Sequence, residues 1–135
     1  MKLKLQLGVQ DWLCITGVWF GLSISFPALA APLPIAQAEI TYLLNHLEQS
    51  GCEFYRNGIW YNAKNARTHL DKKNNYLLGK GLINKTEDFI EQAASGSSMS
   101  GRPYHVGCTG NPPVPSAKWL MRELIHYRKE QADKR

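Results

Sequence analysis

The first 30 residues of this chain are far more apolar than the rest, and they decide which part of it can form a folded domain. Eighteen of these 30 residues are apolar, against 41 of the 105 that follow. Two early lysines precede an apolar run from Leu13 to Phe26, and Ala28 and Ala30 give the small-x-small pattern that signal peptidase accepts. We therefore predict a signal peptide over residues 1–30 and a single mature domain over residues 31–135.

A retained transmembrane helix is the alternative interpretation of this segment. The continuous apolar run is shorter than the roughly 20 residues that span a bilayer, and no basic stop-transfer flank follows it. Membrane contact is therefore expected only through the signal peptide before its cleavage. The expected location is the periplasm of a Gram-negative type of cell. A mature length of 105 residues supplies one core and excludes tandem-domain and repeat architectures.

Export changes the interpretation of the cysteines. Removing Cys14 with the signal peptide leaves Cys52 and Cys108, an even pair in an oxidising compartment. The sequence therefore predicts one disulfide, Cys52–Cys108. This disulfide would close a loop of about 57 residues. The resulting loss of entropy in the unfolded chain would stabilise the fold by about 4 kcal/mol at most.

Neither a metal, a cofactor nor a nucleic acid is expected. The four histidines, His46, His69, His105 and His126, are scattered and form no H-x-x-H unit, and no C-x-x-C unit is present. The predicted mature domain has 14 basic and 10 acidic residues, and those near its end alternate, as on a solvated helix face. A nucleic-acid reader would show a denser basic stripe. The mild positive charge favours an unidentified periplasmic protein or an anionic envelope component as partner.

Four helices are predicted from apolar residues that recur at i, i+3, i+4 and i+7 and from residues that favour helix ends. They are expected over residues 35–49, from the cap Asn62 to about Leu78, from Thr86, and from the cap Ser116.

Asn57-Gly58 is the strongest short signal for a hairpin, because a type I′ turn needs positive φ at both central positions. The register that follows pairs Arg56 with Ile59, Tyr55 with Trp60, and Phe54 with Tyr61. Both faces of this hairpin carry aromatic side chains. Either helices cover both faces, or one face is an exposed aromatic and cationic surface that binds something.

A third strand is predicted over residues 104–108, antiparallel to the first strand of the hairpin, since this places Cys108 opposite Cys52. The fold class is therefore α+β. About four helices are expected to pack on a small three-stranded antiparallel sheet with strand order 2-1-3.

Four motifs occur in one order along the chain: Phe54-x-Arg56-Asn57-Gly58, Ala66-x-x-His69-Leu70-x-x-Lys73, Thr86-x-x-Phe89-Ile90, and the serine-rich segment from Ala94 to Tyr104. With these motifs the chain resembles the YfeK-like family of small bacterial periplasmic proteins, a domain of unknown function. The resemblance implies a signal peptide, a single domain and a periplasmic location. It supplies no catalytic residue, and the cysteine pair is not part of it.

We predict a non-catalytic binding or envelope-interaction module. Its expected binding surface combines the hairpin, the second helix and the serine-rich loop. The candidate residues are Arg56, His69, Lys73, Ser98, Ser100, Arg102 and Tyr104. For Arg56, anchoring an anion and stacking on Tyr61 or bonding to the loop are alternative roles.

Two other functions stay open. One is a small hydrolase-like enzyme with His69 as base, a nucleophile among Ser97, Ser98 and Ser100, and Glu87 or Asp88 as orienting acid. No G-x-S-x-G or S-x-x-K motif accompanies these residues. The other is a periplasmic enzyme inhibitor, because Ser100-Gly101-x-x-Tyr104 is similar to the loop of one class of lysozyme inhibitor. Those inhibitors are β-barrels, however, and a positive net charge is unfavourable against a cationic lysozyme.

Overall fold

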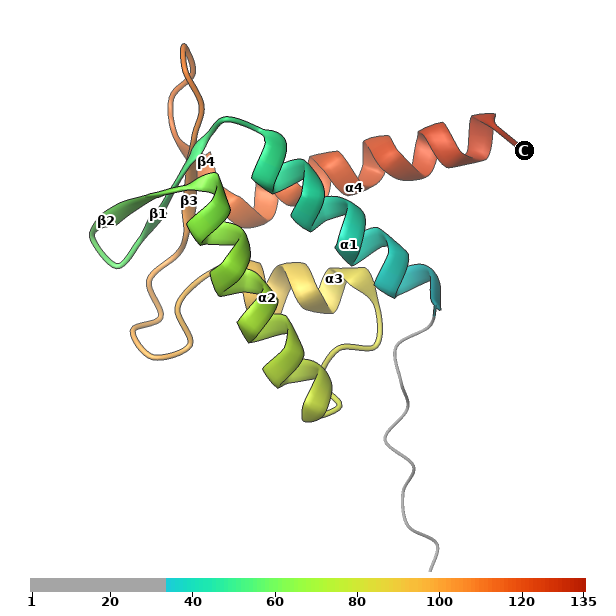
Figure 1. Ribbon diagram of the computed structural model, residues 1–135, viewed down its shortest axis with the longest axis horizontal. Coiled ribbons are helices and arrows are strands. Elements are labelled where there is room, and N and C mark those ends of the chain that lie inside the picture. The colour runs from blue at the N-terminus through green and yellow to red at the C-terminus, as the bar shows by residue number, and fades with distance from the viewer. Residues whose placement is uncertain (1–33) are drawn as a thin grey trace, which may run out of the picture.

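The computed structural model describes residues 34–135, so the predicted signal peptide, residues 1–30, lies outside the described residues. In chain order the elements are α1 (Pro34–Gln49), β1 (Glu53–Arg56), β2 (Ile59–Asn62), α2 (Ala63–Gly79), α3 (Thr86–Asp88), the π-helix η1 (Phe89–Ala94), β3 (His105–Gly107), β4 (Val114–Pro115) and α4 (Ser116–Asp133). Figure 1 shows the strands gathered at one side of the molecule, with the helices extending from them.

The sheet is antiparallel and has four strands in the order β2-β1-β3-β4. The predicted α+β class and the order of the first three strands are confirmed, but the predicted three-stranded sheet is one strand short. The additional strand is β4, in which Val114 pairs with Val106 and Pro115 with His105. The prolines in and just before this strand favour a turn in the sequence, and Pro115 is tolerated because β4 lies at the edge of the sheet.

The hairpin has the predicted register. Arg56 pairs with Ile59, Tyr55 with Trp60, and Phe54 with Tyr61. At the turn, Asn57 has φ 49° and Gly58 has φ 91°. Both values lie in the left-handed region that this type of turn requires.

The predicted disulfide is present. Glu53 pairs with Gly107 across β1 and β3, so the residues next to them, Cys52 and Cys108, face each other with their Cα atoms 4.4 Å apart. The bond joins two positions 56 residues apart in sequence and fixes the end of the β1–β3 pair.

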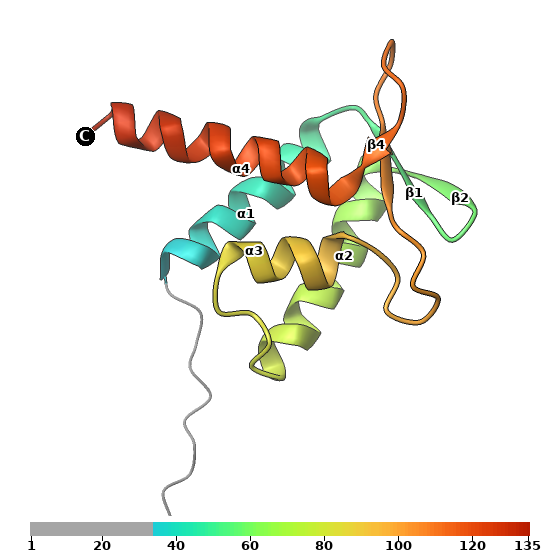
Figure 2. The ribbon, with the colours of Figure 1, turned by 180° about the vertical axis from the view of Figure 1, so that it is seen from behind.

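The helices form the core with one face of the sheet. Figures 1 and 2 show α3 and η1 among α1, α2 and α4, and these helices contact one another. Most of the large, fully buried apolar side chains come from α1, α4, η1 and the loop before α3, and β3 adds Val106. They are Leu43, Leu47, Ile83, Phe89, Ile90, Val106, Leu120 and Leu124. This core is therefore built mainly from helix faces.

The helix starts agree with the sequence prediction at Asn62 and differ at Ser116. Asn62 caps α2, its side-chain oxygen accepting the N–H of Asn65 at 2.9 Å. Ser116 is not the cap of α4 but its first residue, preceded by Pro115. It is buried, and its backbone N–H donates to the carbonyl of Tyr104 at 2.9 Å. The backbone of Ser116 therefore links the start of α4 to the residue before β3. The N-terminus of α4 has no side-chain cap.

The two faces of the sheet differ. On the inner face Phe54 and Val106 are buried, and Phe54 meets the ring of Trp119 edge-on with centroids 5.8 Å apart. On the outer face Tyr55 lies beside Trp60, with ring centroids 5.2 Å apart, and Trp60 is 42% exposed. Helices therefore cover one face of the hairpin only, and the exposed outer face is aromatic but lacks Arg56, which the register places on the inner face. Binding by the outer face stays a prediction.

Within residues 34–135, no helix combines the length and the apolar character that crossing a membrane requires.

Candidate functional site

A pocket of about 290 Å³ lies between the β1–β2 hairpin and α2. Its walls combine apolar and aromatic side chains with a small number of polar groups, as in many ligand sites. The lining residues are Phe54, Tyr55, Arg56, Tyr61, Asn65, Ala66, Thr68, His69, Leu70, Lys72, Tyr104 and Ser116.

Arg56 is the charged group on the hairpin side of the pocket. Its guanidinium carbon lies over the Tyr61 ring, 4.8 Å from the ring centre, in a cation–π contact. Its Nη1 lies 2.8 Å from Nδ1 of His69. The predicted stacking of Arg56 on Tyr61 is therefore present. This contact leaves most of the five guanidinium N–H donors for other partners.

His69 lies between Arg56 and Tyr104. Because Arg56 only donates, the nearer ring nitrogen, Nδ1, accepts, which assigns the ring proton to Nε2. Nε2 is 3.2 Å from the hydroxyl oxygen of Tyr104. Burial, together with the positive charges of Arg56, Lys73 and Lys72, lowers the pKa of His69 to about 4. His69 is therefore neutral near pH 7 and connects Arg56 to Tyr104.

Lys73 joins α2 to the start of the serine-rich loop. Its Nζ donates to the carbonyl of Gly96 at 2.6 Å and lies 5.3 Å from the centre of the Tyr104 ring. Burial and the charge of Arg56 lower the pKa of Lys73. Burial raises the pKa of Tyr104, and Arg56 opposes this rise. Lys73 is thus a positioning residue behind the pocket.

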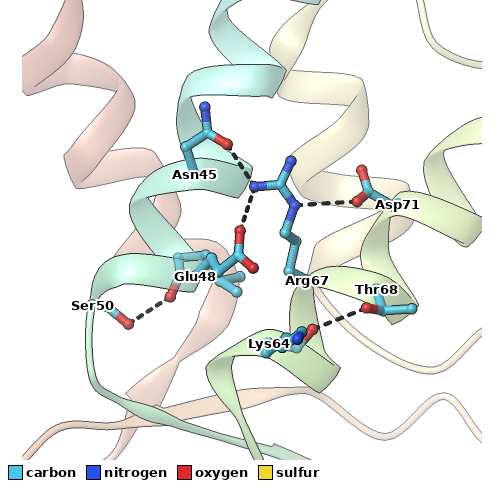
Figure 3. Close-up of polar contacts among 8 residues, drawn as sticks. Asn45, Glu48, Ser50, Lys64, Arg67, Thr68 and Asp71 are labelled. Atoms are coloured by element: carbon cyan, nitrogen blue, oxygen red, sulfur yellow. Dashed lines mark hydrogen bonds and ion pairs between the residues drawn. The ribbon is translucent and has the colours of Figure 1, made fainter.

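These cations have no acidic partner in the part of the chain that the structure describes. None of the ion pairs there includes Arg56, Lys72 or Lys73. Arg67, also on α2, is different: it donates to Asn45 at 2.5 Å, Glu48 at 2.7 Å and Asp71 at 3.3 Å (Figure 3). Helix α2 therefore has one face with a paired arginine, Arg67. Its other face borders the pocket, where the positive charges have no acidic partner among the described residues.

The serine-rich loop is closed by its own backbone. The N–H of Ser97 donates to the carbonyl of Arg102, and the N–H of Gly101 donates to the carbonyl of Ser97, both at 2.9 Å. The hydroxyl of Ser100 donates to Oδ1 of Asn57 in the hairpin turn at 2.8 Å. This ties the loop to the hairpin beside Arg56.

The seven predicted residues fall into three groups. Arg56, His69 and Tyr104 line the pocket. Lys73 contacts Tyr104 from outside the lining, and Ser100 bonds to the hairpin turn. Ser98 and Arg102 are exposed and do not line the pocket, and their binding role stays a prediction.

The sequence-based list of site residues omitted Lys72, and it omitted Tyr61, which was named only as a stacking partner of Arg56. Tyr61 had a signal, because the hairpin register places it on the same face as Arg56. Lys72 follows His69 by three residues on α2, a spacing that puts both on one side of a helix.

A second polar cluster, also missed, joins α1, α3 and α4 away from the pocket. Glu39 is 6% exposed and accepts from Arg128 through both oxygens, at 2.7 and 2.8 Å, and from the hydroxyl of Thr86. The hydrogen bonds from Arg128 lower the pKa of Glu39 despite its burial. Every charge here is paired, so the cluster holds helices together.

No group of three His, Cys, Asp or Glu side chains that could hold a metal ion occurs within residues 34–135.

Residues 34–128 match a family described as a family of unknown function, DUF5329. The chain belongs to this family. It is also 37% identical over 86 residues to the uncharacterized protein YfeK of Salmonella typhimurium, which covers 62% of this chain and 68% of the relative. The resemblance to the YfeK-like family is thereby confirmed. No solved structure matches the chain.

Proposed function

We propose that this protein is an exported, non-catalytic binding protein that takes an anionic ligand into the pocket between the hairpin and α2. The observation that carries this proposal is the gathering of Arg56 and Lys72 at one pocket with no carboxylate paired to either within residues 34–135. A half-buried guanidinium without a counter-charge is costly, and an anion would compensate it.

Export is supported by two separate features. The lysine-containing start, the apolar run and the Ala28-x-Ala30 pattern are typical of a signal peptide. The disulfide between Cys52 and Cys108 suits an oxidising compartment such as the periplasm. Cell fractionation followed by N-terminal sequencing tests this part. A periplasmic protein that begins at Ala31 supports it, and a cytoplasmic protein that keeps residues 1–30 contradicts it.

The contacts of His69 favour binding over catalysis. Among the described residues its ring nitrogens contact Arg56 and Tyr104 and no serine. Of the candidate nucleophiles, Ser100 donates its hydroxyl to Asn57, and the Ser97 hydroxyl oxygen accepts from the N–H of Ser100. A base for a hydrolase needs a nucleophile within hydrogen-bond reach.

The binding test compares two arginine variants of the purified protein. Melting temperature is measured at low ionic strength with a panel of small anions and with matched cations, since a ligand of the folded state raises it. We expect anions to stabilise the protein and Arg56→Gln to lose this effect. Arg67→Gln, which removes a paired arginine from the same helix, is the control and should keep it. Equal stabilisation of Arg56→Gln by the anions would contradict the proposal.

A further inference from the structure

We propose that the ligand class of this pocket is a monocarboxylate with an apolar body, either a free small acid or the C-terminal residue of a peptide. This inference rests on the anion-binding function proposed above and makes it more specific. Three properties of the pocket lead to it: its single interior charge, the arrangement of its donors, and its apolar walls.

The interior of the pocket offers one formal charge. Arg56 is half-buried, whereas Lys72 is exposed at the rim. Lys73 is outside the lining and already donates to the carbonyl of Gly96. His69 accepts from Arg56 and is neutral in that role. One interior cation matches the single negative charge of a carboxylate better than the two charges of a phosphate.

The donors match a planar anion. Contacts with Tyr61 and His69 hold the Arg56 guanidinium in the pocket, and its planar fork can form two parallel hydrogen bonds with a carboxylate. Within residues 34–135 the groups next to Arg56 that accept hydrogen bonds are uncharged, namely the His69 ring and the Tyr104 hydroxyl. Since Tyr104 accepts from Nε2 of His69, its own hydroxyl hydrogen is free to donate to a second carboxylate oxygen.

The apolar walls of the pocket favour an apolar body for the ligand, next to its carboxylate. Phe54, Ala66 and Leu70 are buried side chains that present carbon to the pocket, and Tyr61 adds an aromatic face. A cavity of about 290 Å³ lies at the small end of ligand pockets, which run from about 300 to 1,000 Å³. This is the size of one large apolar amino-acid residue or of a phenylalkanoic acid.

Calorimetric titration of the purified protein at pH 7 tests the class with matched probes. The first pair is 3-phenylpropanoate and its neutral amide, and the second is the peptide Ala-Ala-Phe as free acid and as C-terminal amide. Inorganic phosphate is the fifth probe. We expect the acids to bind at least about tenfold more tightly than their amides, the loss typical of a hydrogen bond to a charged group. The stronger of the two acids identifies whether the source is a free acid or a peptide end.

Two arginine variants test whether the acids bind at Arg56. Arg56→Gln should lose at least about tenfold in affinity for the acids, and the control Arg67→Gln should not change. If Arg56→Gln does not fold, Arg56→Lys replaces it with the same expected loss, because an ammonium cannot form the two parallel bonds. Phosphate binding more tightly than both acids in an Arg56-dependent way would overturn the carboxylate inference and leave anion binding intact. Failure of all five probes would overturn the inference, and failure of the anion panel as well would overturn the proposed function.

Discussion

Arg128 donates from Nε and Nη2 to the two carboxylate oxygens of Glu39, which lies 89 residues earlier in the chain. The pair joins the C-terminal part of α4 to the first half of α1. Thr86 and Glu87 extend it to α3, because the Thr86 hydroxyl donates to Glu39 and Nη1 of Arg128 donates to Glu87 at 2.6 Å. Three helices therefore meet at one paired carboxylate.

Removing the cation from this pair should destabilise the fold. Arg128→Ala leaves the buried Glu39 carboxylate without its cation, and we expect a loss of about 2 to 3 kcal/mol in the free energy of unfolding. The loss stays below that of a fully buried pair because the Arg128 side chain is 45% exposed. Urea unfolding measures it. The double variant Glu39→Met/Arg128→Met should cost less than Arg128→Ala, and a greater cost would contradict this account.

Reduction of the disulfide should lower the melting temperature by more than about 10 °C. The bond closes a loop between positions 56 residues apart, worth about 4 kcal/mol at most in chain entropy, and each kcal/mol moves the midpoint of a domain this size by about 4 to 8 °C. Circular dichroism melts with and without reductant measure the shift. The double variant Cys52→Ser/Cys108→Ser should melt at the lower temperature and not respond to reductant.

His69 should make stability fall as the pH drops below about 6.5. Its pKa is about 4 in the folded chain and 6.5 in the reference state, so between these values the unfolded chain binds a proton that the folded chain does not. We expect a loss of about 1 to 2 kcal/mol between pH 6.5 and pH 5. Below pH 4.5 the lowered pKa of Glu39 adds a further loss. Urea unfolding across this range should give a flatter profile for His69→Gln between pH 6.5 and pH 5, and an unchanged profile would be evidence against the shift.

Gly96→Ala should open the serine-rich loop. A Cβ atom at this position would lie 2.8 Å from the backbone oxygen of Arg102, closer than real contacts allow. We expect a loss of about 1 to 3 kcal/mol and faster hydrogen exchange at the N–H of Ser97. Gly79→Ala is the control, because its Cβ meets nothing within 4 Å. That substitution, at the end of α2, should stabilise the protein by about 0.5 to 1 kcal/mol.

The features that were predicted correctly from the sequence are those that depend on residues close together in the chain. Asn57-Gly58 determined the hairpin register, and the expected Cys52–Cys108 pair indicated a third strand antiparallel to the first. Asn62 was recognisable as a cap because its side chain acts three residues away. The strand β4 was not predicted, because a two-residue strand next to prolines has no pattern of its own and forms only through its pairing with β3.

Longer-range features of the site needed the structure. The contacts of His69 with Arg56 and Tyr104 join the hairpin, α2 and the start of β3. The sequence predicted that these three residues belong to one surface, but not that His69 lies between the other two. Glu39 had a local signal, since it lies beside Ala36, Ile40 and Leu43 on the buried face of α1. Its partner Arg128 had none, because no periodicity relates residues so far apart.

The difference between the two faces of the sheet gives the protein two separate optical reporters. Trp12 and Trp19 belong to the predicted signal peptide, so a protein that begins at Ala31 keeps only Trp60 and Trp119. Trp60 lies half-exposed on the outer face, and Trp119 packs against Phe54 on the inner face. A soluble quencher of indole fluorescence would therefore reach the outer reporter first. The inner one would report the moment at which helix α4 separates from the sheet.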